Sequence, residues 1–231
     1  MLNYKKNLEL LTRNHVYSKE MEHDACGVGL IASTEGKKSR AVVEYGIEAL
    51  KAVWHRGAVD ADGKTGDGAG IHVEIPKDFF IEKIEVTGHD YDNSEICVGM
   101  IFLPRNDYSA QESCKTIVES ELTKNNFSIY GWRQVPVNPG VLGEKAEQTR
   151  PEITQILFKH NNNKLKDKEL NRSLYETRRI IEKKALSNQL KDFYICSFSS
   201  KSIIYKGMFL FYLARCFHFL FFQIFHHLIS L

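Results

Sequence analysis

Two stretches decide the fold: residues 22–32 read EHDACGVGLIA and residues 55–71 read HRGAVDADGKTGDGAGI. The first changes at Cys26 from a polar run to small apolar residues, a pattern typical of a buried strand that begins at a cysteine and approaches a neighbour closely at Gly27 and Gly29. The second stretch is rich in glycine, which lets a backbone turn sharply and come near another group. Together they predict a strand followed by a glycine-rich connection.

The apolar residues between and beyond these stretches predict a mixed α+β domain. Helical spacing predicts helices over residues 39–54, 109–124 and 170–185. Alternation and short apolar runs predict strands over residues 71–75, 96–103, 127–135, 153–157, 193–199 and 202–206, the last two as a hairpin. Gly131 is expected at a β-bulge. Strands outnumber helices and often follow one another directly, which favours an antiparallel sheet layered with helices.

Composition and charge exclude several classes of protein. The 231 residues are 43% hydrophobic and 26% charged, which is a globular composition with room for one sizeable core. The 31 basic and 29 acidic side chains give a net charge of +2 without a basic block, so nucleic acid is not expected as a partner. The five cysteines are widely spaced without a CxxC motif, which argues against a disulfide framework or a metal site and favours the cytoplasm.

Cys26 is the candidate nucleophile. Residues 1–25 are charged throughout and have the character of a polar leader rather than an export signal. A cut between Ala25 and Cys26 would create an α-amino group with a pKa of about 7.7 to 8.0 beside the thiol. That amine could accept the thiol proton near neutral pH. The alternative is that Cys26 is a small buried apolar residue.

The two opening motifs resemble the start of the mature large subunit of glutamate synthases, which are class-II glutamine amidotransferases. Five further strings also resemble this family, so that the resemblance covers about residues 22–208: ICVGMIFLPR, YGWRQVPVN, LYETRRIIE, FYICSFSS and IIYKGM. The resemblance implies an N-terminal-nucleophile hydrolase fold, a four-layer αββα sandwich that is C-terminally incomplete here.

The resemblance also implies a reaction and a set of site residues. The thiolate of Cys26 would attack the side-chain amide of glutamine, release ammonia and leave a glutamyl thioester for water to hydrolyse. The residues expected to shape the substrate site are Arg56, Gly57, Gly66, Asp67 and Gly68. Two roles are open for Arg56: a cation in the active site that favours the thiolate, or a member of a structural ion pair in a tight turn. The GDGAG loop is expected to form part of the wall of the substrate pocket, with Asp67 making a hydrogen bond there.

In the intact enzyme, the resemblance implies that the ammonia aminates 2-oxoglutarate, so that glutamine and 2-oxoglutarate yield two glutamates. No cofactor and no metal is expected in this chain, while FMN and an iron–sulfur cluster are implied for the intact enzyme. The expected partners are glutamine, the remaining domains of the large subunit and a small electron-donating subunit.

The chain divides into three expected segments: a leader over residues 1–25, a partial amidotransferase domain over residues 26–208 and an apolar tail over residues 209–231. The sequence contains neither the arginine motif nor the Asn-Gly pair with which the family holds its substrate and oxyanion. Since one oxyanion donor is worth about 100 to 1,000-fold in rate, little activity is expected of the chain alone. The alternative function is an inactive fragment that contacts a subunit or a membrane.

Half of the 14 phenylalanines lie in the tail between Phe209 and Phe225. A shifted reading frame or a truncation is favoured as its origin over a real membrane segment, because Arg215 and several other polar side chains interrupt the apolar run. A membrane partner is therefore not expected.

Overall fold

The computed structural model describes residues 6, 9, 10, 13, 27–37, 39–53 and 59–208. Its elements of four or more residues are, in chain order, α2 (Arg40–Ala52), β1 (Ala69–Glu74), α3 (Lys77–Val86), β2 (Cys97–Leu103), α4 (Tyr108–Lys124), β3 (Phe127–Gln134), α5 (Glu144–Gln148), β4 (Glu152–His160), α6 (Asp167–Ser187), β5 (Tyr194–Ser199) and β6 (Ser202–Gly207). The mixed α+β class predicted from the sequence is confirmed.

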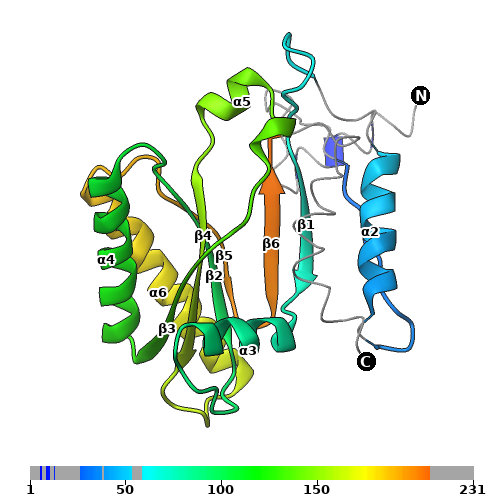
Figure 1. Cartoon of the computed structure of the whole chain (residues 1–231). Helices are drawn as coiled ribbons and strands as arrows, with labels where there is room; N and C mark the ends of the chain where they lie inside the picture. Colours follow the sequence, from blue (N-terminus) through cyan, green and yellow to red (C-terminus); the bar gives the residue numbers. More distant parts are fainter. Residues whose placement is uncertain are drawn as a thin grey trace.

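The strands form two antiparallel sheets (Figure 1). One sheet has four strands in the order β3-β4-β2-β5, and the other pairs β1 with β6. The register between β3 and β4 shifts between Ile129 and Gly131, and Gly131 has a φ of 148°. The predicted bulge at Gly131 is thereby confirmed, and so is the antiparallel layering of strands with helices.

Two apolar cores separate the layers. Side chains of a strand alternate between faces, so in the central strand β2 Cys97 and Ile101 enter one core while Val98 and Met100 enter the other. The first of these cores lies between the four-stranded sheet and the helices α4 and α6. The second lies between the opposite face of that sheet, the β1–β6 pair and α3, with α2 beyond β1 (Figure 1).

A buried carboxylate ties α4 to α6. Glu121 is 3% exposed and accepts hydrogen bonds from Lys184 Nζ at 2.6 Å and Lys124 Nζ at 3.0 Å. These two ammonium groups lower the pKa of the Glu121 carboxyl. The Glu121–Lys184 ion pair links α4 to α6 on the outer face of the sheet, where the other contacts between the helices are apolar.

A polar network crosses the second core. Gln155 of β4 is fully buried, accepts a hydrogen bond from Arg133 at 2.7 Å and donates one to the Tyr205 hydroxyl at 3.2 Å. Burial lowers the pKa of the Arg133 guanidinium, whose carbon lies 5.1 Å from the centre of the Phe79 ring. The amide of Gln155 therefore joins the four-stranded sheet to β6 inside an otherwise apolar layer.

Two sequence predictions are wrong. Residues 27–33 form neither helix nor strand, and Val28 and Leu30 are 92% and 89% exposed, because no strand of the described residues pairs with this segment. The consecutive strands β5 and β6 do not form a hairpin ladder: β5 pairs with β2, and β6 pairs with β1. The Ser197 hydroxyl instead accepts a hydrogen bond from the Ile204 amide at 3.2 Å, so a side chain bridges the two strands as they enter separate sheets.

Candidate functional site

The glycine-rich connection between α2 and β1 folds back on itself. Val59 and Gly66 form an isolated antiparallel bridge, and the Asp60 amide donates to the Thr65 carbonyl at 2.9 Å. The tip turns at Gly63, which has a φ of 67°, a left-handed conformation that glycine adopts without strain. Residues 59–66 are therefore an ordered turn that delivers the chain to β1.

The glycines after this turn allow close contact with β6. A Cβ atom at Gly68 would lie 3.2 Å from the Gly207 carbonyl oxygen, and one at Gly70 would lie 3.0 Å from the Tyr205 carbonyl oxygen. The GDGAG motif thus has a packing role where β1 meets β6. It also carries Asp67 and Gly68 to the edge of a cavity.

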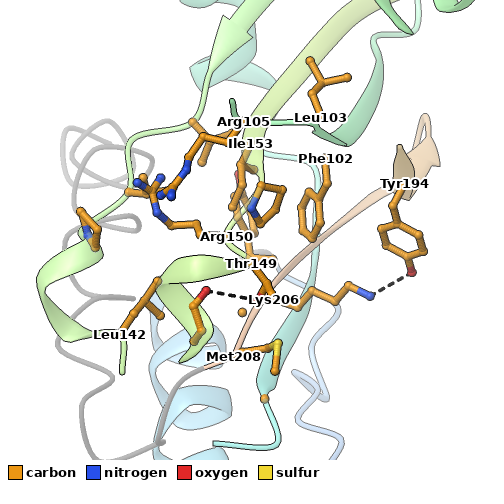
Figure 2. A pocket seen from close by; sticks show the side chains of 18 of the residues that line it. Phe102, Leu103, Arg105, Leu142, Thr149, Arg150, Ile153, Tyr194, Lys206 and Met208 are labelled. Carbon is orange, nitrogen blue, oxygen red and sulfur yellow. Dashed lines mark hydrogen bonds between the residues drawn. The ribbon is translucent and has the colours of Figure 1, made fainter. Parts of the chain in front are cut away.

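The cavity has a volume of about 1080 Å³, and residues of both sheets line it (Figure 2). Asp67 and Gly68 form part of its wall. Much of the remaining lining is apolar and comes from strands of both sheets and the loop before α5: Met100, Phe102, Val135, Leu142, Ile153 and Ile204. Lys206 closes one side, donating to the Tyr194 hydroxyl at 2.9 Å with its Nζ 4.2 Å from the centre of that ring.

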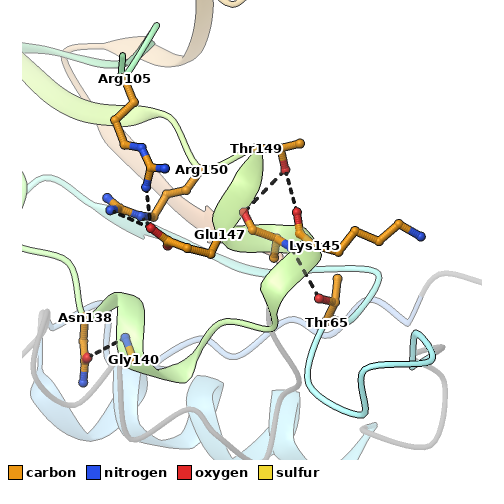
Figure 3. Close-up of polar contacts among 9 residues, drawn as sticks. Thr65, Arg105, Asn138, Gly140, Lys145, Glu147, Thr149 and Arg150 are labelled. Carbon is orange, nitrogen blue, oxygen red and sulfur yellow. Dashed lines mark hydrogen bonds and ion pairs between the residues drawn. The ribbon is translucent and has the colours of Figure 1, made fainter.

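Two guanidinium groups share one carboxylate at the rim (Figure 3). Glu147 of α5 accepts hydrogen bonds from Arg150 Nε at 2.8 Å and from Arg105, which follows β2. Arg150 and Arg105 together lower the pKa of Glu147 to about 2. Both arginines line the cavity. Its lining also includes Lys206 and the acidic side chains Asp67, Asp107 and Asp192, so basic and acidic groups are balanced.

The structure brings together only part of the predicted site. Asp67 and Gly68 line the cavity, whereas Gly66 is buried behind them in its bridge to Val59. Cys26, Arg56 and Gly57 lie outside the described residues, as does the tail over residues 209–231.

Sequence reasoning missed the arginines at the rim. Arg105 lies within a quoted motif, but only the fold joins it to α5, some 40 residues later. A short helix within a loop rich in proline and glycine has too little periodicity to be recognised from sequence.

The described residues offer little to hold a cofactor. Among them, no group of three or more His, Cys, Asp or Glu side chains is arranged to hold a metal ion. An iron–sulfur cluster requires thiolates gathered at one place. Cys97 and Cys114 instead lie in the core beneath α4 and α6, while Cys196 lies in the other core. The part of the chain that the structure describes therefore does not fit such a cluster.

The family follows from comparison with known proteins. Residues 26–220 match the family of class-II glutamine amidotransferases, and the chain belongs to that family. Within the class it is similar to glutamate synthases. It is 56% identical over 207 residues to the large chain of glutamate synthase (NADPH) from Azospirillum brasilense, and 42% identical over 188 residues to ferredoxin-dependent glutamate synthase 2 from Synechocystis sp.. A chloroplastic ferredoxin-dependent glutamate synthase from Spinacia oleracea is 37% identical over 189 residues.

These alignments include most of the chain but little of the relatives. They cover 90%, 81% and 81% of this chain, and 14%, 12% and 12% of the three relatives in the same order. The recognised family is confirmed, and the chain is an enzyme by family. The alternative of a non-catalytic contact module is not favoured. No helix of the described residues is long and apolar enough to cross a membrane.

Proposed function

We propose that this chain supplies the glutamine-hydrolysing half of a glutamate synthase, with Cys26 as the nucleophile. The observation that carries the proposal is the class-II amidotransferase match over residues 26–220, whose first residue is Cys26. In this proposal residues 1–25 are removed as a leader, and residues 26–208 form the amidotransferase domain. Residues 209–231 are treated as a separate tail, although the family match extends to residue 220.

The proposed chemistry uses groups of the new N-terminus. The α-amino group of Cys26 takes the thiol proton, and the thiolate attacks the carbonyl carbon of the glutamine side-chain amide. The C–N bond breaks as the leaving nitrogen takes that proton and departs as ammonia, leaving a glutamyl thioester. Water then adds to the thioester, and glutamate and the free thiol are regenerated. Arg56 and Gly57 are assigned to favouring the thiolate and to admitting the substrate, with Asp67 and Gly68 in the pocket wall.

The other described thiols are poor competitors for this role. Cys97 and Cys114 are fully buried and Cys196 is 6% exposed. Burial raises the pKa of the Cys114 thiol to about 11 and raises that of Cys97 and Cys196 as well. Because a thiolate is the nucleophile, these three side chains should be inert in the folded protein. Cys216 lies outside the described residues, so peptide mapping must separate a label on Cys26 from one on Cys216.

The whole reaction is part of the same proposal. Ammonia and 2-oxoglutarate form an imine that a two-electron reductant converts into a second glutamate. The relatives are named for NADPH, which donates two electrons as a hydride, or for ferredoxin, which donates one electron at a time, so that two reduced ferredoxins would be needed for each glutamate. FMN, an iron–sulfur cluster, the remaining large-subunit domains and a small electron-donating subunit would then belong to the intact enzyme, outside this chain. A cytoplasmic location is proposed from the free thiols Cys97, Cys114 and Cys196.

The complete domain is proposed to be a four-layer αββα sandwich of the N-terminal-nucleophile hydrolase type. The sequence of layers from α4 and α6 through the two sheets to α2 supports this arrangement.

The proposal is tested by mapping the product of a glutamine-mimicking electrophile. The purified chain is treated with the electrophile, and intact mass and peptide mapping then identify the new N-terminus and the labelled residue. One adduct on an N-terminal Cys26, absent from a Cys26→Ala variant, is the expected result. Labelling spread over several cysteines, or a retained leader with no label on Cys26, would overturn the proposal.

A further inference from the structure

We propose that Asp62 and Thr65 are positioning residues, which clamp the turn over residues 59–66 to α5 and thereby fix the Asp67–Gly68 wall of the cavity. This inference rests on the proposed function, because it treats that wall as part of the glutamine site. The two side chains do not line the cavity themselves, so their effect on substrate would be indirect.

Asp62 organises the turn from within. Its carboxylate accepts hydrogen bonds from the Lys64 amide at 2.9 Å, the Thr65 amide at 2.7 Å and the Thr65 hydroxyl at 2.5 Å. These donors hold the pKa of the Asp62 carboxyl well below its usual range. An aspartate with these contacts fixes the conformation of residues 62–65, two residues before Asp67.

Thr65 connects the turn to α5. It is only 3% exposed, and its hydroxyl accepts a hydrogen bond from the Ala146 amide at 3.4 Å (Figure 3). Gly143 precedes the helix and has no side chain with which to cap it. The first turn of a helix leaves amide donors that need partners from elsewhere. Thr65 supplies one of them across 81 positions of sequence.

Gly143 packs against Asp62 and Thr65 so closely that a side chain there would force these groups to shift. A Cβ atom there would lie 2.2 Å from Asp62 Oδ2, 2.3 Å from Thr65 Oγ1 and 2.6 Å from the Thr65 amide nitrogen. The backbone of Gly143 has a φ of −72° and a ψ of 162°, which alanine adopts without strain. The glycine is therefore required by space, and its replacement acts directly on Asp62 and Thr65.

The opposite side of α5 is held independently. Glu147 binds Arg105 after β2 and Arg150 after the helix, so α5 joins the glycine-rich turn to the four-stranded sheet (Figure 3). Where α5 faces the turn over residues 59–66, Lys145 Nζ also lies 2.6 Å from Asp60 Oδ2. This ion pair is exposed and therefore contributes little to holding the two segments together. The position of Asp67 and Gly68 relative to the four-stranded sheet is therefore fixed through α5.

The test uses two matched pairs of variants in the full chain. Gly143→Ala introduces the close contacts, whereas Gly140→Ala, in the same loop, would place its Cβ 3.3 Å from the flexible Asn138 side chain. Thr65→Val removes the hydroxyl at nearly constant volume, and Thr65→Ser keeps it. We expect Gly143→Ala and Thr65→Val to speed amide hydrogen exchange in residues 62–68 by about tenfold or more. Gly140→Ala and Thr65→Ser should remain close to the parent.

A second readout separates positioning from general loosening. The concentration of glutamine-mimicking electrophile that half-saturates labelling of Cys26 should rise by roughly 10 to 100-fold in Gly143→Ala and Thr65→Val, since misplacement by about 1 Å can cost that much. Labelling of Cys26 by iodoacetamide, which needs no glutamine pocket, should stay within about twofold of the parent, in keeping with a thiol whose own surroundings are unchanged.

The outcomes distinguish the two proposals. If the parent chain labels at Cys26 and Gly143→Ala has the same half-saturating concentration, the positioning role is wrong while the proposed function stands. If the parent does not label at all, the proposed function fails. Unchanged exchange in residues 62–68 of Gly143→Ala would then overturn the clamp as well.

Discussion

Adding one methyl group to the central strand should destabilise the protein. Gly99 lies in β2 between its two cross-strand neighbours, Ile156 of β4 and Phe198 of β5. A Cβ atom at Gly99 would lie 2.8 Å from Ile156 Cγ2 and 2.9 and 3.0 Å from two ring carbons of Phe198. Both neighbours are buried in the core beneath α4 and α6, so neither can move without displacing others.

The size of the effect follows from two opposing contributions. Forcing an extra methyl group into a packed core costs about 1 to 3 kcal/mol. Replacing glycine by alanine inside a strand recovers roughly 0.5 to 1 kcal/mol of backbone entropy. The difference is about 0 to 2.5 kcal/mol. Because a new Cβ would press on neighbours in both adjacent strands, we expect Gly99→Ala to fall in the upper part of that range and to lower the free energy of unfolding by about 1 to 2.5 kcal/mol.

The matched control is the same substitution in a helix. At Gly46 of α2, the nearest atom to a new Cβ is Ile71 Cδ1 at 3.6 Å, an ordinary contact distance. Gly46→Ala should raise the free energy of unfolding by about 0.5 to 1 kcal/mol. Urea unfolding followed by circular dichroism measures both variants, with equal m values as the check that only stability has changed. A Gly99→Ala protein as stable as the parent would refute the packing of β2 against β4 and β5.

Three further predictions follow from buried polar groups and thiols. Glu121→Gln should lower the free energy of unfolding by about 1 to 2 kcal/mol at pH 7. Because the pKa of Glu121 is lowered in the folded state, the parent loses this stability as the pH falls below about 4, and the difference between the two proteins should then close. Urea unfolding at pH 7 and below pH 4 measures the difference in free energy of unfolding, and an equal difference at both pH values would count against the ion pair. Gln155→Leu removes the acceptor of Arg133 and should cost about 1 to 3 kcal/mol by the same assay, with a neutral result speaking against the network. Cys97 and Cys114 should react with an aromatic disulfide reagent only after unfolding, and mass spectrometry showing either one modified in the native protein would contradict their burial.

The sequence predicted α2, α4, α6 and the six strands because their apolar patterns are strong. It missed α3, a short helix that follows Pro76 and has no side-chain cap at its start. The stripe Leu170, Leu174 and Ile181 lies on the buried face of α6 as expected, and the run in β2 feeds both cores. Asp107 caps α4 by accepting a hydrogen bond from the Ala110 amide at 2.9 Å, and α4 begins at Tyr108, one residue before the predicted start. Local chemistry decides such features, so they can be read from a single sequence.

Features that depend on distant partners could not be predicted. The pairing of β6 with β1 joins residues more than 120 positions apart, so adjacency in the sequence wrongly favoured a hairpin with β5. The segment after Cys26 has the composition of a strand, yet residues 27–33 lack a pairing partner among the described residues. The clamp of Thr65 on α5 likewise depends on contacts across the fold.

The candidate site divides in the same way. Asp67 and Gly68 were found from a motif, and the structure adds the reason for the glycine, which is the close approach to Gly207. Arg105 and Arg150 carried no signal of their own, because their convergence on Glu147 depends on where β2 and α5 meet.

The most direct test of the central claim is to trap the reaction with glutamine itself. The chain is mixed with L-glutamine, quenched in acid and digested, and the peptide that begins at Cys26 is weighed while ammonia is assayed in the same sample. Because little turnover is expected of the chain alone, the incubation is prolonged to allow a single slow turnover. The account then predicts that a fraction of the Cys26 peptide carries one glutamyl group as a thioester, released by hydroxylamine and absent from Cys26→Ala, with at least one ammonia per thioester. A Cys26 peptide without a glutamyl group, together with no ammonia above the level of Cys26→Ala, would contradict it.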